Sequence, residues 1–156
     1  MIVSIDVDNQ GWSRIPALEE LTRKAVEAAA IANGASHENF EVTILFTDDQ
    51  SIAKLNGDWR GKPIPTNVLS FPAGDLEVPA GEAIPLGDIA LAYGVVAREA
   101  AEQGKTLPQH ATHLIVHGLL HLLGHDHETE EEAVRMESLE TAILKGLGVS
   151  DPYERQ

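Results

Sequence analysis

The sequence predicts an α+β fold, in which a small mixed four-stranded sheet packs with about five helices. Strand-like and helix-like segments mix along the chain without strict alternation, which is typical of this class rather than of a regular α/β protein. A length of 156 residues and a hydrophobic content of 43% suit a single domain with a sizeable core. We therefore expect one domain over residues 1–156.

Four segments have the apolar patterns of strands. Residues 40–46 alternate, so that one face of the strand is expected to be buried through Phe40, Val42, Ile44 and Phe46. The other strands are predicted at residues 2–7, 67–71 and 86–92. Residues 72–85 contain three prolines and two glycines and are expected to form an exposed loop.

Helices are expected at residues 16–32, 94–103 and 107–123, and in two segments that begin with a capping-box pattern. Thr47 with Gln50 precedes a short helix that ends near Asn56, and Thr129 with Glu132 precedes the last helix. The last helix has an apolar stripe, expected to pack in the core, of Ala133, Met136, Leu139, Ile143 and Leu147. A solvated face is expected from the nearby glutamates Glu128, Glu130, Glu131, Glu132, Glu137 and Glu140.

The most informative segment is HGLLHLLGHDH, residues 117–127. His117 and His121 are four positions apart, so on a helix with about 3.6 residues per turn their side chains project from one face. Gly124 can adopt a left-handed conformation and end the helix, which allows the chain to return His127 to the first two rings. Three converging imidazoles form a ligand set for zinc with the fourth position open, as in catalytic zinc sites.

The spacing of this segment matches the metzincin signature H-E-x-x-H-x-x-G-x-x-H at every position except one. Gly118 occupies the place of the glutamate, which is the general base of zinc peptidases. We therefore expect a metzincin-like metal helix without peptidase chemistry. Zinc is the expected ion, although nickel or another divalent metal would also accept three imidazoles.

Five of the seven histidines lie between positions 113 and 127. His113 and His125 continue the four-residue track of the predicted ligands. They are interpreted as residues that support a ligand, face the substrate or pack in the interior. His37 and His110 are interpreted as surface or structural residues.

Charge and composition limit the possible partners and location. The net charge of −14 opposes direct attraction to nucleic acid, because phosphate contacts require lysine and arginine. Lys54, Arg60 and Lys62 nevertheless predict a local positive patch. The chain has no cysteine, and therefore no disulfide and no thiolate ligand. No apolar run is long enough to span a membrane and the N-terminus lacks a leader pattern, so we expect a cytoplasmic protein.

Four polar residues outside the histidines are further candidates. Arg60 offers planar donors that match phosphate oxygens, although a surface ion pair is the simpler interpretation. Ser70 lacks a G-x-S-x-G elbow, so a structural or substrate contact is expected instead of a nucleophile. Asp88 and Asp126 are candidates to orient a ligand histidine, and Asp126 equally suits a turn.

From about residue 40 to residue 153 the chain resembles the YbeY-like endoribonucleases, which are bacterial ribosomal-RNA maturation factors. HGLLHLLGHDH is similar to the family motif H-G-x-L-H-L-x-G-Y-D-H, with His125 in place of tyrosine. PTNVLSF is similar to the family segment P-T-D-V-L-S-F, with Asn67 in place of aspartate. LGDI at residues 86–89 and DPY at residues 151–153 also match.

The resemblance implies that His117, His121 and His127 bind zinc and that Arg60 is the functional arginine of the cleft. Asn67 carries no charge, which argues against this side chain as a base. Histidine, unlike tyrosine, is a residue type that titrates near neutrality, so its presence at position 125 is expected to alter the pH dependence.

The motif and the resemblance together predict a metal-dependent endoribonuclease that is specific for single-stranded RNA. Its expected role is ribosomal RNA processing, namely 3′-end maturation of small-subunit rRNA, and ribosome quality control, with ribosomal or ribosome-associated proteins as partners. Zinc on three neutral imidazoles can lower the pKa of water to about 7. The hypothesis is therefore that hydroxide attacks the phosphodiester while Arg60 stabilises the developing charge.

Three alternatives remain open from the sequence. The RNA 2′-hydroxyl can replace hydroxide as the nucleophile, which would leave a cyclic phosphate. A second alternative is a zinc hydrolase of another substrate class, although Gly118 argues against a peptidase. The third is a non-enzymatic ribosome-assembly factor with a structural metal, which the acidic composition favours.

Overall fold

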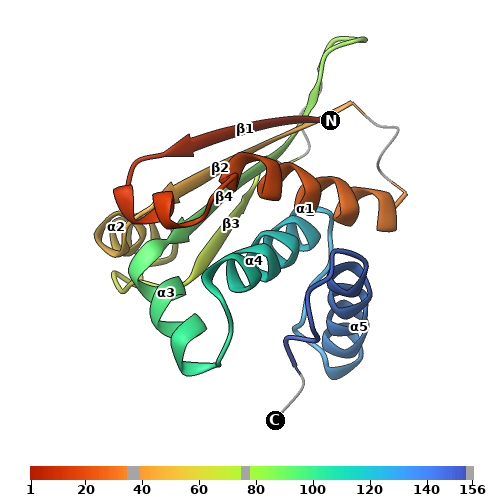
Figure 1. The fold of residues 1–156 in the computed structure, drawn as a ribbon. Coiled ribbons are helices and arrows are strands. Elements are labelled where there is room, and N and C mark those ends of the chain that lie inside the picture. The colour runs from red at the N-terminus through yellow and green to blue at the C-terminus, as the bar shows by residue number, and fades with distance from the viewer. Residues whose placement is uncertain (35–38, 75–77, 154–156) are drawn as a thin grey trace.

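The structure is a computed structural model, and it describes residues 1–34, 39–74 and 78–153. Its sheet has the strand order β1-β2-β4-β3 (Figure 1). The strands are β1 (Ile2–Val7), β2 (Phe40–Thr47), β3 (Val68–Pro72) and β4 (Ile84–Ala92). β2 runs parallel to both of its neighbours, and β3 lies antiparallel to β4 at the edge. The predicted small mixed sheet is confirmed.

Within the described residues there are five α-helices and one short 3-10 helix, η1 (Gln10–Arg14). The α-helices are α1 (Leu18–Ala32), α2 (Asp49–Arg60), α3 (Tyr93–Glu102), α4 (Leu107–Leu122) and α5 (Glu130–Gly146). Each of the five predicted helices is present. None of them is both long and apolar enough to cross a membrane.

The alternating pattern of β2 divides the apolar side chains between two cores. Val42, Ile44 and Phe46 are fully buried in the main core together with residues of α1 and α4, which cover one face of the sheet (Figure 1). Ile52 of α2 packs on the opposite face in a smaller core with Leu69, Ala90 and Ala92. The smaller core leaves part of this second face uncovered.

The ends of two helices test the capping predictions. The prediction that Thr47 caps α2 is wrong, because Thr47 is the buried last residue of β2. The cap is Asp48, whose Oδ1 accepts a hydrogen bond of 2.7 Å from the backbone N–H of Ser51. The prediction for α5 is confirmed, because the Thr129 hydroxyl accepts from the backbone N–H of Glu132 at 3.1 Å.

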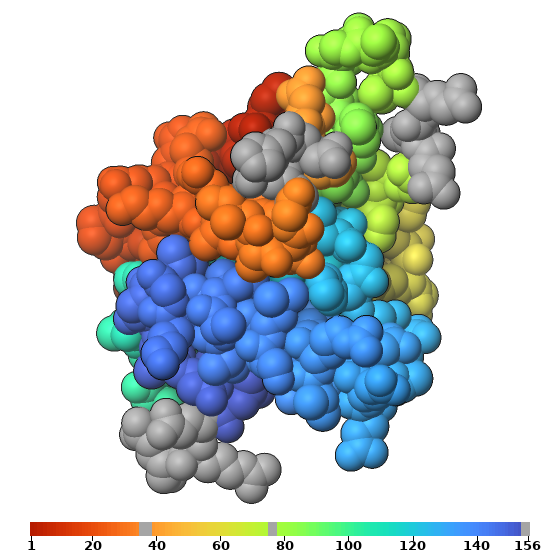
Figure 2. Space-filling view, turned by 90° about the vertical axis from the view of Figure 1, so that its right-hand side faces the viewer, coloured from red at the N-terminus to blue at the C-terminus, as the bar shows by residue number. Residues whose placement is uncertain are grey.

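Helix α5 closes the main core by packing against α4 and the end of α1. In the space-filling view of Figure 2, α5 (blue) lies against the C-terminal end of α1 (orange). Met136, Ile143 and Leu144 are buried in this contact. Glu140 is also buried, with no exposed surface, although the sequence predicted it on the solvated face. A carboxylate therefore enters the interior next to the histidine helix.

Candidate metal centre

Helix α4 and the turn after it bring the three predicted ligands together. The side chains of His117 and His121 lie on one face of α4, with their Nε2 atoms 3.1 Å apart. The His127 ring lies beyond the helix end, and its centroid is 5.9 Å from that of His117 and 5.1 Å from that of His121. The three rings lie close together at one cleft, as is expected of a three-histidine metal site.

The return of the chain depends on Gly124. This residue has a φ of 101°, in the left-handed region that favours glycine. The backbone N–H of His125 then donates to the carbonyl of Leu120 at 3.0 Å, which closes the helix end. The turn is stabilised further by Asp126, whose Oδ1 accepts from the backbone N–H of His127 at 2.7 Å.

The turn is also attached to α1. The Nε2 atom of His125 is 2.6 Å from Oδ1 of Asn33, the residue that ends α1. The Asn33 amide itself donates to the carbonyl of Ala29 at 2.9 Å, so its orientation is fixed. His125, predicted to support a ligand or face the substrate, therefore lines the cleft and links the His127 turn to a packed helix.

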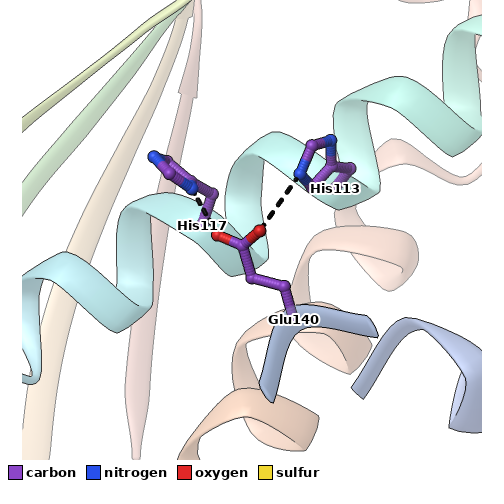
Figure 3. Close-up of side chains that lie close together, drawn as sticks. All are labelled: His113, His117 and Glu140. Atoms are coloured by element: carbon purple, nitrogen blue, oxygen red, sulfur yellow. Dashed lines mark hydrogen bonds and ion pairs between the residues drawn. The ribbon is translucent and has the colours of Figure 1, made fainter. Parts of the chain in front are cut away.

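A buried carboxylate supports His117 from the side away from His121. Figure 3 shows Glu140 of α5 between His113 and His117 of α4. The Glu140 carboxylate is hydrogen-bonded to Nδ1 of His117 and to the hydroxyl of Tyr153, and it lies 3.4 Å from Nε2 of His113. With Nδ1–H donated to Glu140, the Nε2 lone pair of His117 is free to bind a cation, as in carboxylate–histidine–metal arrangements.

The charges at the site suit metal binding. Burial raises the pKa of Glu140, but hydrogen bonds with His113, His117 and Tyr153 outweigh this effect and lower the pKa to about 2. Burial lowers the pKa of His121, and the neighbouring His117 and His127 lower it further. A lowered pKa at His121 and an ionised Glu140 both favour metal binding, because a metal binds the neutral imidazole and the ionised carboxylate.

Two groups of donor atoms can hold a metal in the described part of the chain. One consists of His113, His117 and Glu140, and the other of His121, Asp126 and His127. In the first group the Glu140 oxygens already accept hydrogen bonds from His117 and Tyr153. The second group lies at an open cleft. The Nε2 atom of His121, one of its members, is 3.1 Å from the Nε2 atom of His117.

The cleft has a volume of about 670 Å³, and most of the predicted site residues line it. Its walls include Arg60, Asn67, Ser70, His117, His121, His125, Asp126, His127 and Glu128. Arg60 stands exposed at the end of α2, with Nη2 3.5 Å from the carbonyl of Ser70. Its guanidinium is therefore available to a ligand in the cleft.

Asn67 is held at the cleft wall by two hydrogen bonds. Its Oδ1 accepts from the backbone N–H of Val68 at 2.6 Å, and its Nδ2 donates to Glu99 at 3.0 Å. Glu99 also bonds Nε2 of the buried His110 at 2.9 Å, so His110 has a structural role. His37 lies outside the described residues.

Gly118 has a packing role that the motif comparison did not reveal. A Cβ atom at this position would lie 3.1 Å from both Ile89 Cγ2 and Ser70 Oγ, so glycine allows α4 to approach β3 and β4 closely. The Ser70 hydroxyl donates to the carbonyl of Gly118 at 3.3 Å. Ser70 therefore ties the sheet to the metal helix, and a larger side chain at position 118 would have to displace Ile89 and Ser70.

Asp88 is the predicted site residue that the structure does not bring to the histidines. It pairs with Phe71 in the β3–β4 ladder and lines a groove on the opposite face of the sheet, with Asp6 and Glu41. The sequence placed it near the site because it follows Gly87 at the predicted start of the strand. The alternation of β4 instead turns its side chain away from α4.

Glu140 and Tyr153 are the site residues that sequence reasoning missed. Glu140 was assigned to an acidic surface because several glutamates surround it. Its spacing gave a different signal, because Met136, Glu140 and Ile143 lie four and three positions apart, on one helix face. An acidic residue within an apolar stripe indicates a buried, partnered carboxylate.

Comparisons with known proteins show the family of the chain. A family profile described as endoribonuclease YbeY matches residues 6–148. The chain is 51% identical to the endoribonuclease YbeY of Dinoroseobacter shibae, over 97% of this chain and 90% of that protein. It is 48% identical to the endoribonuclease YbeY of Allorhizobium ampelinum, over 99% of this chain and 95% of that protein.

A solved structure is also similar. The solution structure of a protein from Thermotoga maritima matches with a TM-score of 0.59 and 25% sequence identity, over 99% of this chain and 100% of that one. The fold described above is therefore one that an experimentally determined protein also adopts.

Proposed function

The chain belongs to the endoribonuclease YbeY family, and we propose that it hydrolyses single-stranded RNA with a divalent metal ion bound by His117, His121 and His127. The observation that supports this proposal is the proximity of the three imidazole rings at one cleft, with Glu140 behind His117. The proposed catalytic domain spans residues 1–156. Family membership argues against a hydrolase of another substrate class and against a non-enzymatic assembly factor.

Zinc is the proposed ion, because three nitrogen donors and one open position are typical of catalytic zinc sites, although nickel or another divalent ion suits the same donors. His113, His117 and Glu140 form the competing group. We favour the three histidines because the Glu140 carboxylate has no exposed surface and already accepts hydrogen bonds. When bound, the ion supplies Lewis-acid polarisation of a phosphate oxygen and lowers the pKa of water.

The protein's own groups then bind and orient the RNA phosphate. Arg60 stands at the cleft with planar donors that can pair with two phosphate oxygens and stabilise the negative charge that grows during cleavage. Asp126 holds the His127 turn, and Ser70 holds β3 against α4. Gly118 leaves the cleft without the glutamate base of zinc peptidases, so the proposed nucleophile is hydroxide, and the expected products have linear phosphate ends.

Ribosomal RNA is the proposed substrate, with 3′-end maturation of small-subunit rRNA and ribosome quality control as the proposed roles in the cytoplasm. The net charge of −14 gives little long-range attraction to free RNA. Ribosomal or ribosome-associated proteins are therefore proposed to present the RNA to the cleft. The local cations Arg60 and Lys62 act at short range once the strand is delivered.

The test is RNA digestion by protein of known metal content, with His121→Ala, Arg60→Ala and, as a control, Arg135→Ala. His121→Ala is expected to lose both bound metal and cleavage. Arg60→Ala should keep the metal and lose about 10²- to 10³-fold in kcat, by analogy with loss of a charge-stabilising donor. Arg135 is exposed on α5 and its variant should cleave normally. Normal cleavage by both site variants would show that the site is misplaced, and cyclic phosphate ends would show that the 2′-hydroxyl attacks.

A further inference from the structure

A groove on the other side of strand β3 joins the metal cleft at its rim. It lies on the uncovered face of the sheet and has a volume of about 720 Å³. Trp59 and Phe71 form one of its walls, and Pro72 lines both this groove and the cleft. β3 is an edge strand, so a ligand that leaves the cleft over Pro72 enters the groove that Trp59 also lines.

Trp59 is unusually exposed for a large aromatic residue. Its exposed fraction is 73%, whereas Trp12, the second tryptophan of the chain, is fully buried. The Trp59 ring lies at 6.2 Å and 55° to the ring of Phe71, which supports it from one side. An indole that is held by one neighbour and otherwise open to solvent is a suitable platform for a nucleobase.

The neighbouring residue connects this platform to the cleft. Trp59 and Arg60 are consecutive at the end of α2, and they lie on the two sides of β3. Arg60 is near the Ser70 carbonyl at the cleft, while Trp59 contacts Phe71 in the groove. The end of α2 thus places the Arg60 guanidinium at the cleft and the Trp59 ring in the adjoining groove.

We propose that Trp59 is a base-stacking subsite for single-stranded RNA, occupied by a nucleotide next to the one whose phosphate lies at the histidines. This proposal rests on the proposed function. Arg60, which lies near the Ser70 carbonyl of β3, attracts the phosphates at the cleft. Asp6, Glu41 and Asp88 line the groove and repel phosphates, so the strand stays at the rim instead of following the groove.

The first experiment compares Trp59→Ala, Trp59→Tyr and the control Ile64→Ala in the metal-loaded full chain. Ile64 is an exposed apolar residue of the following loop, outside both hollows. With a long single-stranded RNA, Trp59→Ala should raise KM about 10-fold, in the range found for loss of base stacking, with kcat within about twofold. Trp59→Tyr should restore KM, and Ile64→Ala should not change it.

Substrate length provides a second readout. Trimming the RNA until it no longer extends beyond the cleft should remove the difference between wild type and Trp59→Ala. A structural role of Trp59 would instead affect short and long RNA equally, which would overturn the proposal. An unchanged KM on every length would overturn it as well, while cleavage that still depends on His121 would leave the proposed function intact.

Tryptophan fluorescence gives a readout that is independent of cleavage. Single-stranded RNA should quench the emission of Trp59, and Trp59→Phe, which keeps Trp12, should lose this response. Equal quenching in both proteins would contradict the proposal. Quenching by oligolysine but not by RNA would also contradict it, and would assign the groove to a basic protein partner.

Discussion

Nδ1 of His117 is hydrogen-bonded to the buried carboxylate of Glu140, so a residue of α5 sets the orientation of a proposed metal ligand on α4. We predict that Glu140→Gln lowers metal affinity about 10- to 100-fold, the usual effect of losing such a supporting group. A competition titration with a chromophoric chelator measures this change. Glu137→Gln, at an exposed position of the same helix, is the matched control and should bind metal normally.

The same titration separates the two possible donor groups. If His117, His121 and His127 bind the ion, His127→Ala should lose most of the affinity, while His113→Ala should retain binding. The opposite result, with binding abolished in His113→Ala and retained in His127→Ala, would assign the ion to His113, His117 and Glu140.

Replacement of Gly118 should affect packing before it affects chemistry. A Cβ atom at this position meets Ile89 and Ser70 at 3.1 Å, so Gly118→Ala is expected to lower the free energy of unfolding by about 1–3 kcal/mol, measured in urea. Gly146→Ala is the control, because a Cβ atom there meets no neighbour within 4 Å.

Gly118→Glu restores the metzincin signature and should destabilise the protein more than Gly118→Ala does. It should not create peptidase activity, because Ile89 and Ser70 crowd the position from which the added side chain starts. A folded Gly118→Glu variant that hydrolyses peptides would show that this explanation of the glycine is incorrect.

The contact between His125 and Asn33 should contribute to metal affinity through the position of His127. Asn33→Ala removes a hydrogen bond of 2.6 Å to the turn. We expect roughly a fivefold weaker affinity for metal, equivalent to about 1 kcal/mol for one hydrogen bond. Calorimetric titration with zinc checks this value. Asn39→Ala, at an exposed asparagine before β2, serves as the control, and an equal loss in both variants would refute a specific role of Asn33.

His110 should make the stability of the metal-free protein fall in mild acid. Burial lowers its pKa below the usual 6.5, and His113 and Lys105 add to this effect while Glu99 opposes it. Above pH 6.5 the imidazole is neutral in both the folded and the unfolded state, so it adds no pH dependence. Below pH 6.5 the unfolded chain binds a proton that the folded chain does not, which lowers the free energy of unfolding by up to about 1.4 kcal/mol per pH unit.

The variant His110→Gln cannot titrate and keeps an amide that can donate to Glu99. The unfolding free energies of wild type and His110→Gln are measured in chelator from pH 7.5 to 5. As the pH falls, the wild type should lose more unfolding free energy than the variant. A constant difference over this range would contradict a lowered pKa of His110.

Local patterns were sufficient to predict the elements and the spatial proximity of the three histidine rings. Strand alternation in β2 and the four-residue spacing of His117 and His121 depend only on the periodicity of strands and helices, which the chain itself fixes. The Gly124 turn was predictable for the same reason, because a positive φ there requires glycine. Thr47 failed as a cap because Asp48, one residue later, was an equally good acceptor.

The remaining features depend on which surfaces meet in three dimensions. Glu140 became part of the site because α5 turns that side chain toward α4. Asp88 lies away from the site because successive side chains of a strand point to opposite faces of the sheet. The sequence did not show which face of β4 would meet the metal helix. The groove beside Trp59 likewise exists because α2 covers only part of the second face of the sheet.

The position of Glu140 in the chain makes the proposed metal site depend on the C-terminal helix. Glu140 follows His117 by 23 residues, and Tyr153, which holds the carboxylate, comes later still. A nascent polypeptide that has emerged only through residue 127 carries all three imidazoles but lacks the group that aligns the first of them. We therefore expect a polypeptide truncated before α5 to bind metal more weakly than the full chain, although it carries all three imidazoles.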